Sequence, residues 1–463
     1  MVIHKDKIMA FKFRKGADNG LWCSTLLPVC LIPFINADSG FHLLNFAICS
    51  TCCLFSIFTE QKSPTSNSYR NGITISGYAA LLSLFLSHWF SYNLVVMFIV
   101  CHATLWYYSY LVRNLLLYCP GSFTLGEAQL ISQGVIMFLH CCIVTLLNEY
   151  NVLNNGLHFQ VVPESVRSLQ IMLLGTFLLL QTLYMVPFLK EGLKFFISCF
   201  AVLFLMMGAW QISLKQNVFL WLFSFCNHSK TRMLIILFWF VSTLASVTIV
   251  IITNKWEISK GSSITRKYFH LIINAIYIPG ILYDQELLIF ASGVALTIFI
   301  LLEVCRIINA FIIGPVIEDA FQVFLDEKDS GFLILSHIYL LIGCSSPIWL
   351  YGYSSNSQSA HISLFSGVIS VGFGDTAAAI GGTLFGQNNW KGSKKTYEGT
   401  ICAFTVQLIT SLFFLSYGHV FSTWNVFLTV IAIFSTSILE AKTTQVDNLV
   451  LPLFLFSFLS WIL

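Results

Sequence analysis

The residues best suited to chemistry stand close together between positions 371 and 399. Asp375 lies inside an otherwise apolar stretch, where a carboxylate is costly unless a cation or a metal accompanies it. The loop beyond it carries glycines, ammonium groups and hydroxyls, namely Gly386, Lys391, Gly392, Ser393, Lys394, Lys395 and Thr396. Backbone N–H groups and point charges of this kind bind phosphates. We therefore predict a functional role for Asp375 and a phosphate-binding loop, the alternative being a basic loop that touches anionic lipid.

Small residues recur at four-residue spacing around Asp375, at Gly374, Ala378 and Gly382. On a helix this spacing places them on one face, where they allow a neighbouring helix to approach closely. Helix packing alone explains these small residues, whereas it does not explain the carboxylate beside them.

A second group of charged residues is the run Asp326-Glu-Lys-Asp-Ser-Gly331, directly before an apolar stretch. Acidic side chains and a serine at a helix N-terminus can cap the helix and complement its dipole. The same carboxylates also suit Mg²⁺, which usually takes one or two carboxylates together with phosphates and waters. Capping and metal binding are compatible, so both interpretations stay open.

The composition places these residues in a membrane protein. Of 463 residues, 57% are hydrophobic and 10% are charged, whereas soluble domains carry about 25% charged residues. The net charge of +3 is spread over short loops without a broad basic face, so we expect no nucleic-acid partner. The basic start leads into apolar sequence without a small-residue cleavage motif, so we expect no cleavable signal peptide.

Apolar stretches long enough to cross a bilayer follow one another along the chain. The predicted spans are near 21–36, 41–58, 72–89, 91–112, 127–148, 168–187, 193–212, 233–252, 269–283, 287–303, 332–351, 361–382, 399–417, 424–440 and 451–463. The first two are also compatible with one broken element, and the stretch 217–226 with a re-entrant piece. We therefore expect an all-α, polytopic membrane protein with about 15 transmembrane helices, in the range of roughly 13 to 15.

The basic residues predict the orientation of the second half of the chain. If the chain crosses the membrane at every predicted span, the following loops share one side: 254–268, 304–331, 383–398 and 441–450. From position 254 onward that side holds ten Lys and Arg residues and the other side none: Lys255, Lys260, Arg266, Lys267, Arg306, Lys328, Lys391, Lys394, Lys395 and Lys442. The positive-inside rule makes this side cytoplasmic. A loop with Lys215, Lys230 and Arg232 would lie on the opposite side, against the rule, so the rule does not fix the orientation of the first half of the chain.

We divide the chain into N-terminal transmembrane helices, 1–253, and a C-terminal catalytic transmembrane region, 254–463. The first part is expected to serve as a scaffold or a lipid-substrate region. The second part holds most of the acidic residues, and ten of these lie at or near the cytoplasmic side: Glu303, Glu318, Asp319, Asp326, Glu327, Asp329, Asp375, Glu398, Glu440 and Asp447. Such a face suits an anionic ligand with a metal, whereas a transporter places ionisable groups nearer the midplane of its spans.

Three smaller features share this face, and each has a structural alternative. Arg266-Lys267-Tyr-Phe-His270 begins a span, where basic side chains can simply anchor at the interface. Glu303 and Arg306 stand three residues apart, as in a helix-end ion pair. Glu440 and Asp447 near Pro452 are compatible with an interfacial turn, although they return carboxylates to the same side.

Taken together, these motifs resemble the dolichol kinase family over residues from about 260 to 455. The resemblance rests on the Gly374-Asp375 span with the stretch from Trp390 to Thr400, and on the runs at 326–331, 266–270 and 303–306. It implies an enzyme of the endoplasmic reticulum that phosphorylates dolichol with CTP and a divalent metal. It also implies that the segment Thr383 to Glu398 holds the nucleotide on the cytoplasmic side.

Within this resemblance we assign roles to individual residues. Lys394 and Lys395 are predicted to bind the triphosphate, Asp326 and Asp329 to bind Mg²⁺ or another divalent cation, and Asp375 to hold metal or accept the alcohol proton. The predicted nucleotide-binding residues are Arg266, Lys267, His270, Thr383, Gly386, Lys391, Gly392, Ser393, Lys394, Lys395, Thr396 and Glu398. The expected product is dolichyl phosphate, the lipid carrier of protein glycosylation. Competing assignments are a CTP-dependent kinase for phytol or diacylglycerol, and a transporter or scramblase of lipid-linked precursors.

Overall fold

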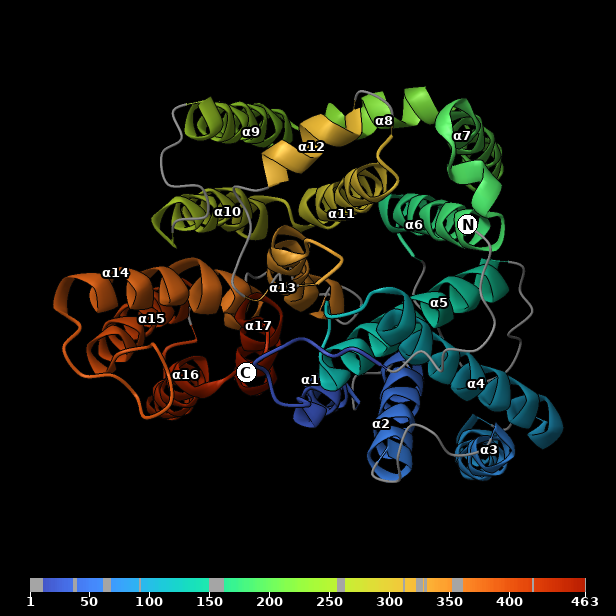
Figure 1. The fold of residues 1–463 in the computed structure, drawn as a ribbon, viewed down its shortest axis with the longest axis horizontal. Coiled ribbons are helices and arrows are strands. Elements are labelled where there is room, and N and C mark those ends of the chain that lie inside the picture. Colours follow the sequence, from blue (N-terminus) through green and yellow to red (C-terminus); the bar gives the residue numbers. More distant parts are fainter. Residues whose placement is uncertain are drawn as a thin grey trace. The chain divides into compact units, whose positions relative to one another are not determined.

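Helices are the regular elements of the described part of the chain. The computed structural model describes residues 11–35, 40–60, 68–90, 93–149, 162–255, 263–310, 313–321, 328, 331–351, 361–418 and 420–462. Within these ranges the elements are helices, apart from an isolated antiparallel bridge between Asn389 and Thr396. The expected all-α class is therefore confirmed (Figure 1).

The chain forms two compact units, of which the first comprises residues 1–160, 327–333 and 444–446. Its helices are η1 (Leu21–Thr25), α1 (Leu26–Leu31), η2 (Ile32–Phe34), α2 (Gly40–Glu60), α3 (Ser68–Phe90), α4 (Leu94–Tyr118) and α5 (Leu125–Glu149). The stretch from Leu21 to Phe34 is thus broken into three short pieces. These units do not test the functional division at residue 254, which stays a prediction.

A buried ion pair is the central polar feature of the first unit. Arg14 donates to Glu127 over 2.8 Å, and both side chains are almost fully buried. Glu127 also accepts from the backbone N–H of Thr124, whose hydroxyl accepts from the backbone N–H of Glu127 in return. This reciprocal pair is a capping box, which the spacing Thr124-x-x-Glu127 encodes and which fixes the start of α5.

The second unit comprises residues 161–326, 334–443 and 447–463. Its helices begin with α6 (Glu164–Met185), η3 (Pro187–Lys190), α7 (Gly192–Leu214), α8 (Val218–Cys226), α9 (Lys230–Lys255), α10 (Ser263–Tyr283), α11 (Gln285–Ile307) and α12 (Ile313–Phe321). They continue with α13 (Ser336–Tyr351), η5 (Ile362–Phe365), η6 (Val368–Asp375), α14 (Thr376–Phe385), α15 (Tyr397–Tyr417), α16 (Thr423–Lys442) and α17 (Asp447–Leu459). In Figure 1, α14, α15 and α16 lie together in orange and red, and consecutive members of this set pack against each other.

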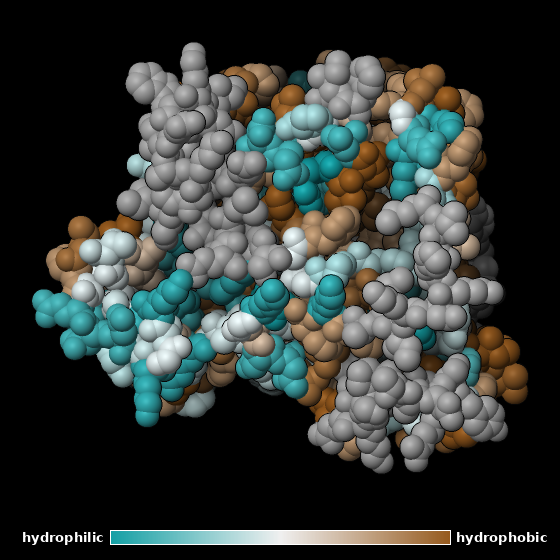
Figure 2. Space-filling view, viewed as in Figure 1, coloured by the Kyte–Doolittle hydropathy of each residue, from teal (hydrophilic) through white to brown (hydrophobic). Residues whose placement is uncertain are grey.

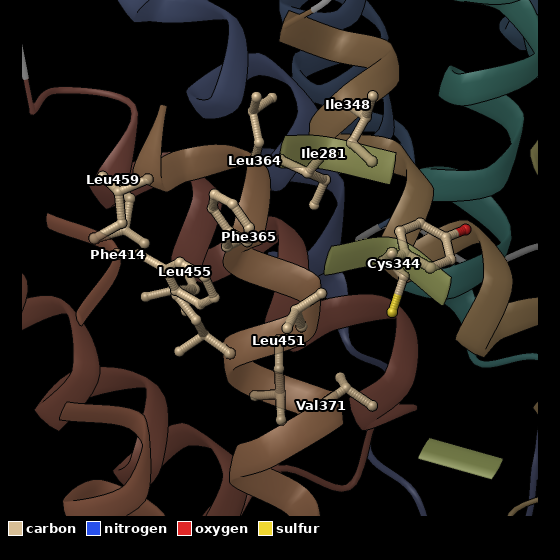
Figure 3. Close-up of a cluster of buried hydrophobic side chains, with 14 of the residues drawn as sticks. Ile281, Cys344, Ile348, Leu364, Phe365, Val371, Phe414, Leu451, Leu455 and Leu459 are labelled. Carbon is tan, nitrogen blue, oxygen red and sulfur yellow. The ribbon is translucent and has the colours of Figure 1, made fainter. Parts of the chain in front are cut away.

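The core of the second unit is built around α17. Its residues are apolar on every side, which is typical of a helix that is buried all round. Figure 3 shows Leu451 and Leu455 of this helix beside Phe365 of η5 and Phe414 of α15. The rings of Phe365 and Phe414 stack with their centroids 3.9 Å apart. This packing fixes α17, and with it the position of the residue at its N-terminus.

Nine of the described helices are long and apolar enough to cross a membrane. Large apolar side chains also reach the surface, where Phe204 of α7 is 79% exposed, and brown hydrophobic side chains are visible in Figure 2. An apolar exterior of this kind suits contact with lipid, so the chain is a multi-pass membrane protein. The predicted count of 13 to 15 spans is not confirmed by these nine helices. The loop 304–331 contains a short helix that was not predicted, α12, which carries Glu318 and Asp319.

Candidate functional site

Three carboxylates from separate helices converge in the second unit. Asp375 ends η6, Glu440 lies in the last turn of α16, and Asp447 begins α17. One oxygen from each lies within 4.8 Å of the other two. Because hard divalent cations prefer oxygen ligands from carboxylates, this group fits a site for such a cation.

Local backbone structure places each carboxylate. Residues Val368–Asp375 form a π-helix, a wider turn that is rare and often found at functional sites. The connection from α16 to α17 is only four residues long, from Thr443 to Val446, so Glu440 and Asp447 lie close together. The site therefore depends on the last turn of one helix and the first turn of the next.

Lys395 bridges two of the carboxylates. Its Nζ lies 2.6 Å from Glu440 Oε1 and 3.3 Å from Asp447 Oδ2, and it also donates to the backbone carbonyl of Glu440 over 2.6 Å. Burial alone would lower the pKa of Lys395, but Asp447 and Glu440 more than offset this effect and raise the pKa above its ordinary value. The ammonium group therefore stays charged at neutral pH.

The third carboxylate is paired by α10. Lys267 donates a hydrogen bond to Asp375, and His270, one turn later, has its Nε2 atom 3.8 Å from the same oxygen. The imidazole of His270 is buried beside this pair. Three carboxylates thus meet two ammonium groups and one imidazole.

The loop between α14 and α15 is folded on itself. Trp390 donates its backbone N–H to Lys395 and Tyr397 donates to Asn388, each over 2.9 Å, around Gly392 with a φ of 79°. Glycine adopts this left-handed conformation without the cost that a side chain would impose. The fold separates two neighbouring lysines, because Lys395 enters the carboxylate group while Lys394 is exposed.

Several predicted nucleotide-binding side chains support this loop. The Thr396 hydroxyl caps α15 by accepting from the backbone N–H of Gly399, and the Ser393 hydroxyl accepts from the backbone N–H of Lys395. Glu398 accepts from both the backbone and the side-chain amide of Asn388. Lys391 and Gly392 are exposed at the loop tip.

The predicted close packing of small residues is confirmed. A Cβ atom at Gly374 would overlap the side chain of Gln407 on α15. A Cβ atom at Gly399 would lie 2.7 Å from the carbonyl of Ala378 and 3.3 Å from Cα of Gly382. The backbones of α14 and α15 therefore touch, which holds Asp375 and the loop in a fixed relation.

The structure brings together only some of the predicted site residues. Asp375, Lys267, His270 and Lys395 meet, whereas Thr383 and Gly386 are exposed on the last turn of α14 and just beyond it. Asp326 and Asp329 lie outside the described residues, and so does the side chain of Arg266.

Two members of the carboxylate group, Glu440 and Asp447, had no assigned role in the sequence analysis. The available signal was their placement on the same side of the membrane as Asp375, separated by a short turn between two apolar stretches. By contrast, Glu303 and Arg306 form the ion pair that their spacing predicts, with 2.7 Å between a guanidinium nitrogen and a carboxylate oxygen. Arg306 also forms an ion pair with Glu318.

Comparison with known proteins identifies relatives over most of the chain. A sequence profile described as dolichol kinase matches residues 60–393. A dolichol kinase of Bos taurus is 31% identical over 468 residues, covering 96% of this chain and 86% of the relative. One of Mus musculus is 34% identical, covering 75% and 67%, and one of Saccharomyces cerevisiae is 27% identical, covering 64% and 54%.

No solved structure matches the chain. The sequence comparisons nevertheless agree on one family. The profile match covers α10, the π-helix and residues 386–393 of the loop between α14 and α15, residues 386–396, here called the lysine loop. The chain belongs to the dolichol kinase family.

Proposed function

We propose that the chain transfers the γ-phosphoryl group of CTP to the terminal hydroxyl of dolichol, forming dolichyl phosphate for protein glycosylation. The observation that carries this proposal is the convergence of Asp375, Glu440 and Asp447 with Lys267 and Lys395 in a member of this family. Phosphoryl transfer is largely a matter of positioning and charge neutralisation, and this set of charges supports both. The assignment of dolichol as the substrate rests on the names of the relatives. The assignment of CTP as the phosphoryl donor rests on the resemblance of the lysine loop to that of the family.

The three carboxylates are the residues that would hold a divalent cation, because their oxygens are close enough to share one ion. When bound, Mg²⁺ or another divalent cation would supply charge neutralisation at the triphosphate. Lys394, which is exposed, is proposed to bind the outer phosphates, while Lys395 fixes Glu440 and Asp447. Asp326 and Asp329 remain further predicted ligands.

A membrane assay tests this function. Membranes that contain the chain are incubated with CTP labelled at the γ-phosphate, Mg²⁺ and dolichol, phytol or diacylglycerol in parallel. We expect label in dolichyl phosphate, with ATP a poorer donor. Label transferred preferentially to phytol or diacylglycerol would contradict the assignment of dolichol, and lack of transfer to any lipid alcohol would contradict the kinase.

Lys394 and Lys395 should differ in their effects, because Lys395 is paired with Glu440 and Asp447 whereas Lys394 is exposed. Lys394→Ala is expected to raise the KM for CTP about tenfold without lowering the amount of inserted protein, since one ammonium contact to phosphate is lost. Lys395→Ala should also lower kcat, because it releases Glu440 and Asp447. The check is steady-state kinetics at saturating dolichol, with the exposed Lys442→Ala as the control. Equal CTP kinetics for Lys394→Ala and the parent would exclude Lys394 from the site.

We propose that the protein has 13 to 15 spans, resides in the endoplasmic reticulum and presents residues 383–398 to the cytosol, where CTP is available. Residues 254–463 would then hold the catalytic region, and residues 1–253 the scaffold.

Cysteines introduced at Gln387 or Asn389, which are exposed, should react with an impermeant maleimide after the plasma membrane alone is opened. The native cysteines that the structure describes are buried or only partly exposed, so the parent provides the background. Labelling that requires opening of the internal membranes would contradict the proposed orientation.

A further inference from the structure

One face of α10 carries a polar side chain on each successive turn. Lys267, His270, Asn274 and Tyr277 follow one another at intervals of three or four residues, which aligns them along the helix. The first two meet Asp375, and Tyr277 shares a hydrogen bond of 2.5 Å with Ser345 of α13. Asn274 lies between these partnered positions.

Asn274 is buried without a partner of its own. The residue is 3% exposed, and within the described part of the chain neither its amide oxygen nor its amide nitrogen forms a hydrogen bond. A buried amide with no hydrogen bond is destabilising, and in a membrane-embedded bundle water from outside does not compensate for it. The fold therefore maintains a polar group that only an additional hydrogen-bonding molecule would satisfy.

The surroundings of Asn274 connect it to the site. Its amide lies against Gly372 in the π-helix, where a Cβ atom would overlap the amide oxygen and nitrogen. Gly372 precedes Asp375 by three residues, which is less than one turn of the wider π-helix, so Asn274 contacts the same helical segment that carries the carboxylate. Asn274 also lies two turns after Lys267 along α10, and therefore further from the basic N-terminus of that helix.

We propose that Asn274 binds the terminal hydroxyl of the lipid alcohol. An alcohol offers one O–H donor and acceptor lone pairs, which matches the one acceptor and the donors of an amide. A triphosphate does not suit this position, because a polyanion would be placed deeper than the lysines that neutralise it. This inference rests on the proposed function. It assigns binding of the alcohol that receives the phosphoryl group to α10.

Kinetics of the purified, full-length protein in lipid nanodiscs test the inference. Asn274→Ala should raise the KM for dolichol about tenfold and leave the KM for CTP unchanged, because hydrogen bonds to the hydroxyl alone are lost. Asn425→Ala is the matched control, since its amide donates to the carbonyl of Val420 over 2.8 Å and its loss should lower the Tm without changing either KM. An unchanged KM for dolichol in Asn274→Ala would overturn the inference and leave water as the occupant of this position.

Thermal unfolding without CTP gives a second readout that does not depend on activity. Dolichol in the nanodisc should raise the Tm of the parent but not the Tm of Asn274→Leu. Without dolichol, Asn274→Leu should have the higher Tm of the two proteins, because its side chain has no unsatisfied amide. A lower Tm of Asn274→Leu without dolichol would show that the amide is structural and would overturn the inference. If dolichol stabilises the parent through Asn274 but is not phosphorylated, the proposed activity fails and the binding inference stands.

Discussion

Asp375→Asn is expected to lower dolichyl phosphate formation at least 100-fold, roughly 2.7 kcal/mol of barrier. Asparagine keeps the size of the side chain but removes the negative charge that faces Lys267 and the other two carboxylates. A cation or a departing proton requires that charge. The measurement is product formed per unit of membrane-inserted protein at saturating CTP and Mg²⁺.

The alternative for Asp375 is a purely structural polar group. In that case asparagine would be tolerated, since burying a neutral amide costs less than burying a carboxylate. A bulky residue at Ala378, against α15, would instead be damaging. Activity of Asp375→Asn within about threefold of the parent, roughly 0.7 kcal/mol of barrier, would eliminate the catalytic and metal roles.

Glu440→Gln is expected to shift the dependence of activity on Mg²⁺ to higher concentration. Loss of a residue that only supports the ligands of a metal site lowers metal affinity by about 10- to 100-fold. Because Glu440 belongs to the carboxylate group itself, the required Mg²⁺ concentration should rise by at least that factor. High Mg²⁺ should restore part of the activity. The measurement is a Mg²⁺ titration of initial rate at fixed free CTP, repeated for Asp447→Asn.

Glu303→Gln provides the control for Glu440. Glu303 is also buried and ion-paired, to Arg306, and it accepts from the backbone N–H of Ile334 over 2.9 Å. Its loss should lower the Tm and leave the Mg²⁺ titration in place. If Glu440→Gln behaves in the same way as Glu303→Gln, the carboxylates serve stability and the proposed cation site is wrong.

The sequence alone was sufficient for features that depend on local pattern. Apolar stretches marked almost every helix, and the intramembrane carboxylate singled out Asp375, which the structure places in the carboxylate group. The small residues at Gly374 and Gly382 indicated close helix contact, which α14 and α15 make. Each of these signals lies within one turn or one helix length.

Features that depend on tertiary contact were not accessible in this way. Glu440 and Asp447 meet Asp375 because three helices pack together, and no local spacing encodes that meeting. Lys394 and Lys395 are adjacent and chemically identical, and only the folded loop sends one into the carboxylates. The short helix α12 is amphipathic and stands among charged residues, so a search for long apolar stretches passes over it.

The π-helix at Val368–Asp375 has a consequence for how this segment can change in evolution. A residue removed between Gly372 and Asp375 would change the angle between these two positions around the helix axis, because a π-turn holds more residues than an ordinary helical turn. Asp375 could then no longer face α10, α16 and α17 while Gly372 still faces Asn274. We therefore expect an insertion or deletion between Gly372 and Asp375 to displace this carboxylate from Glu440 and Asp447, whereas a substitution that keeps the length leaves its position unchanged.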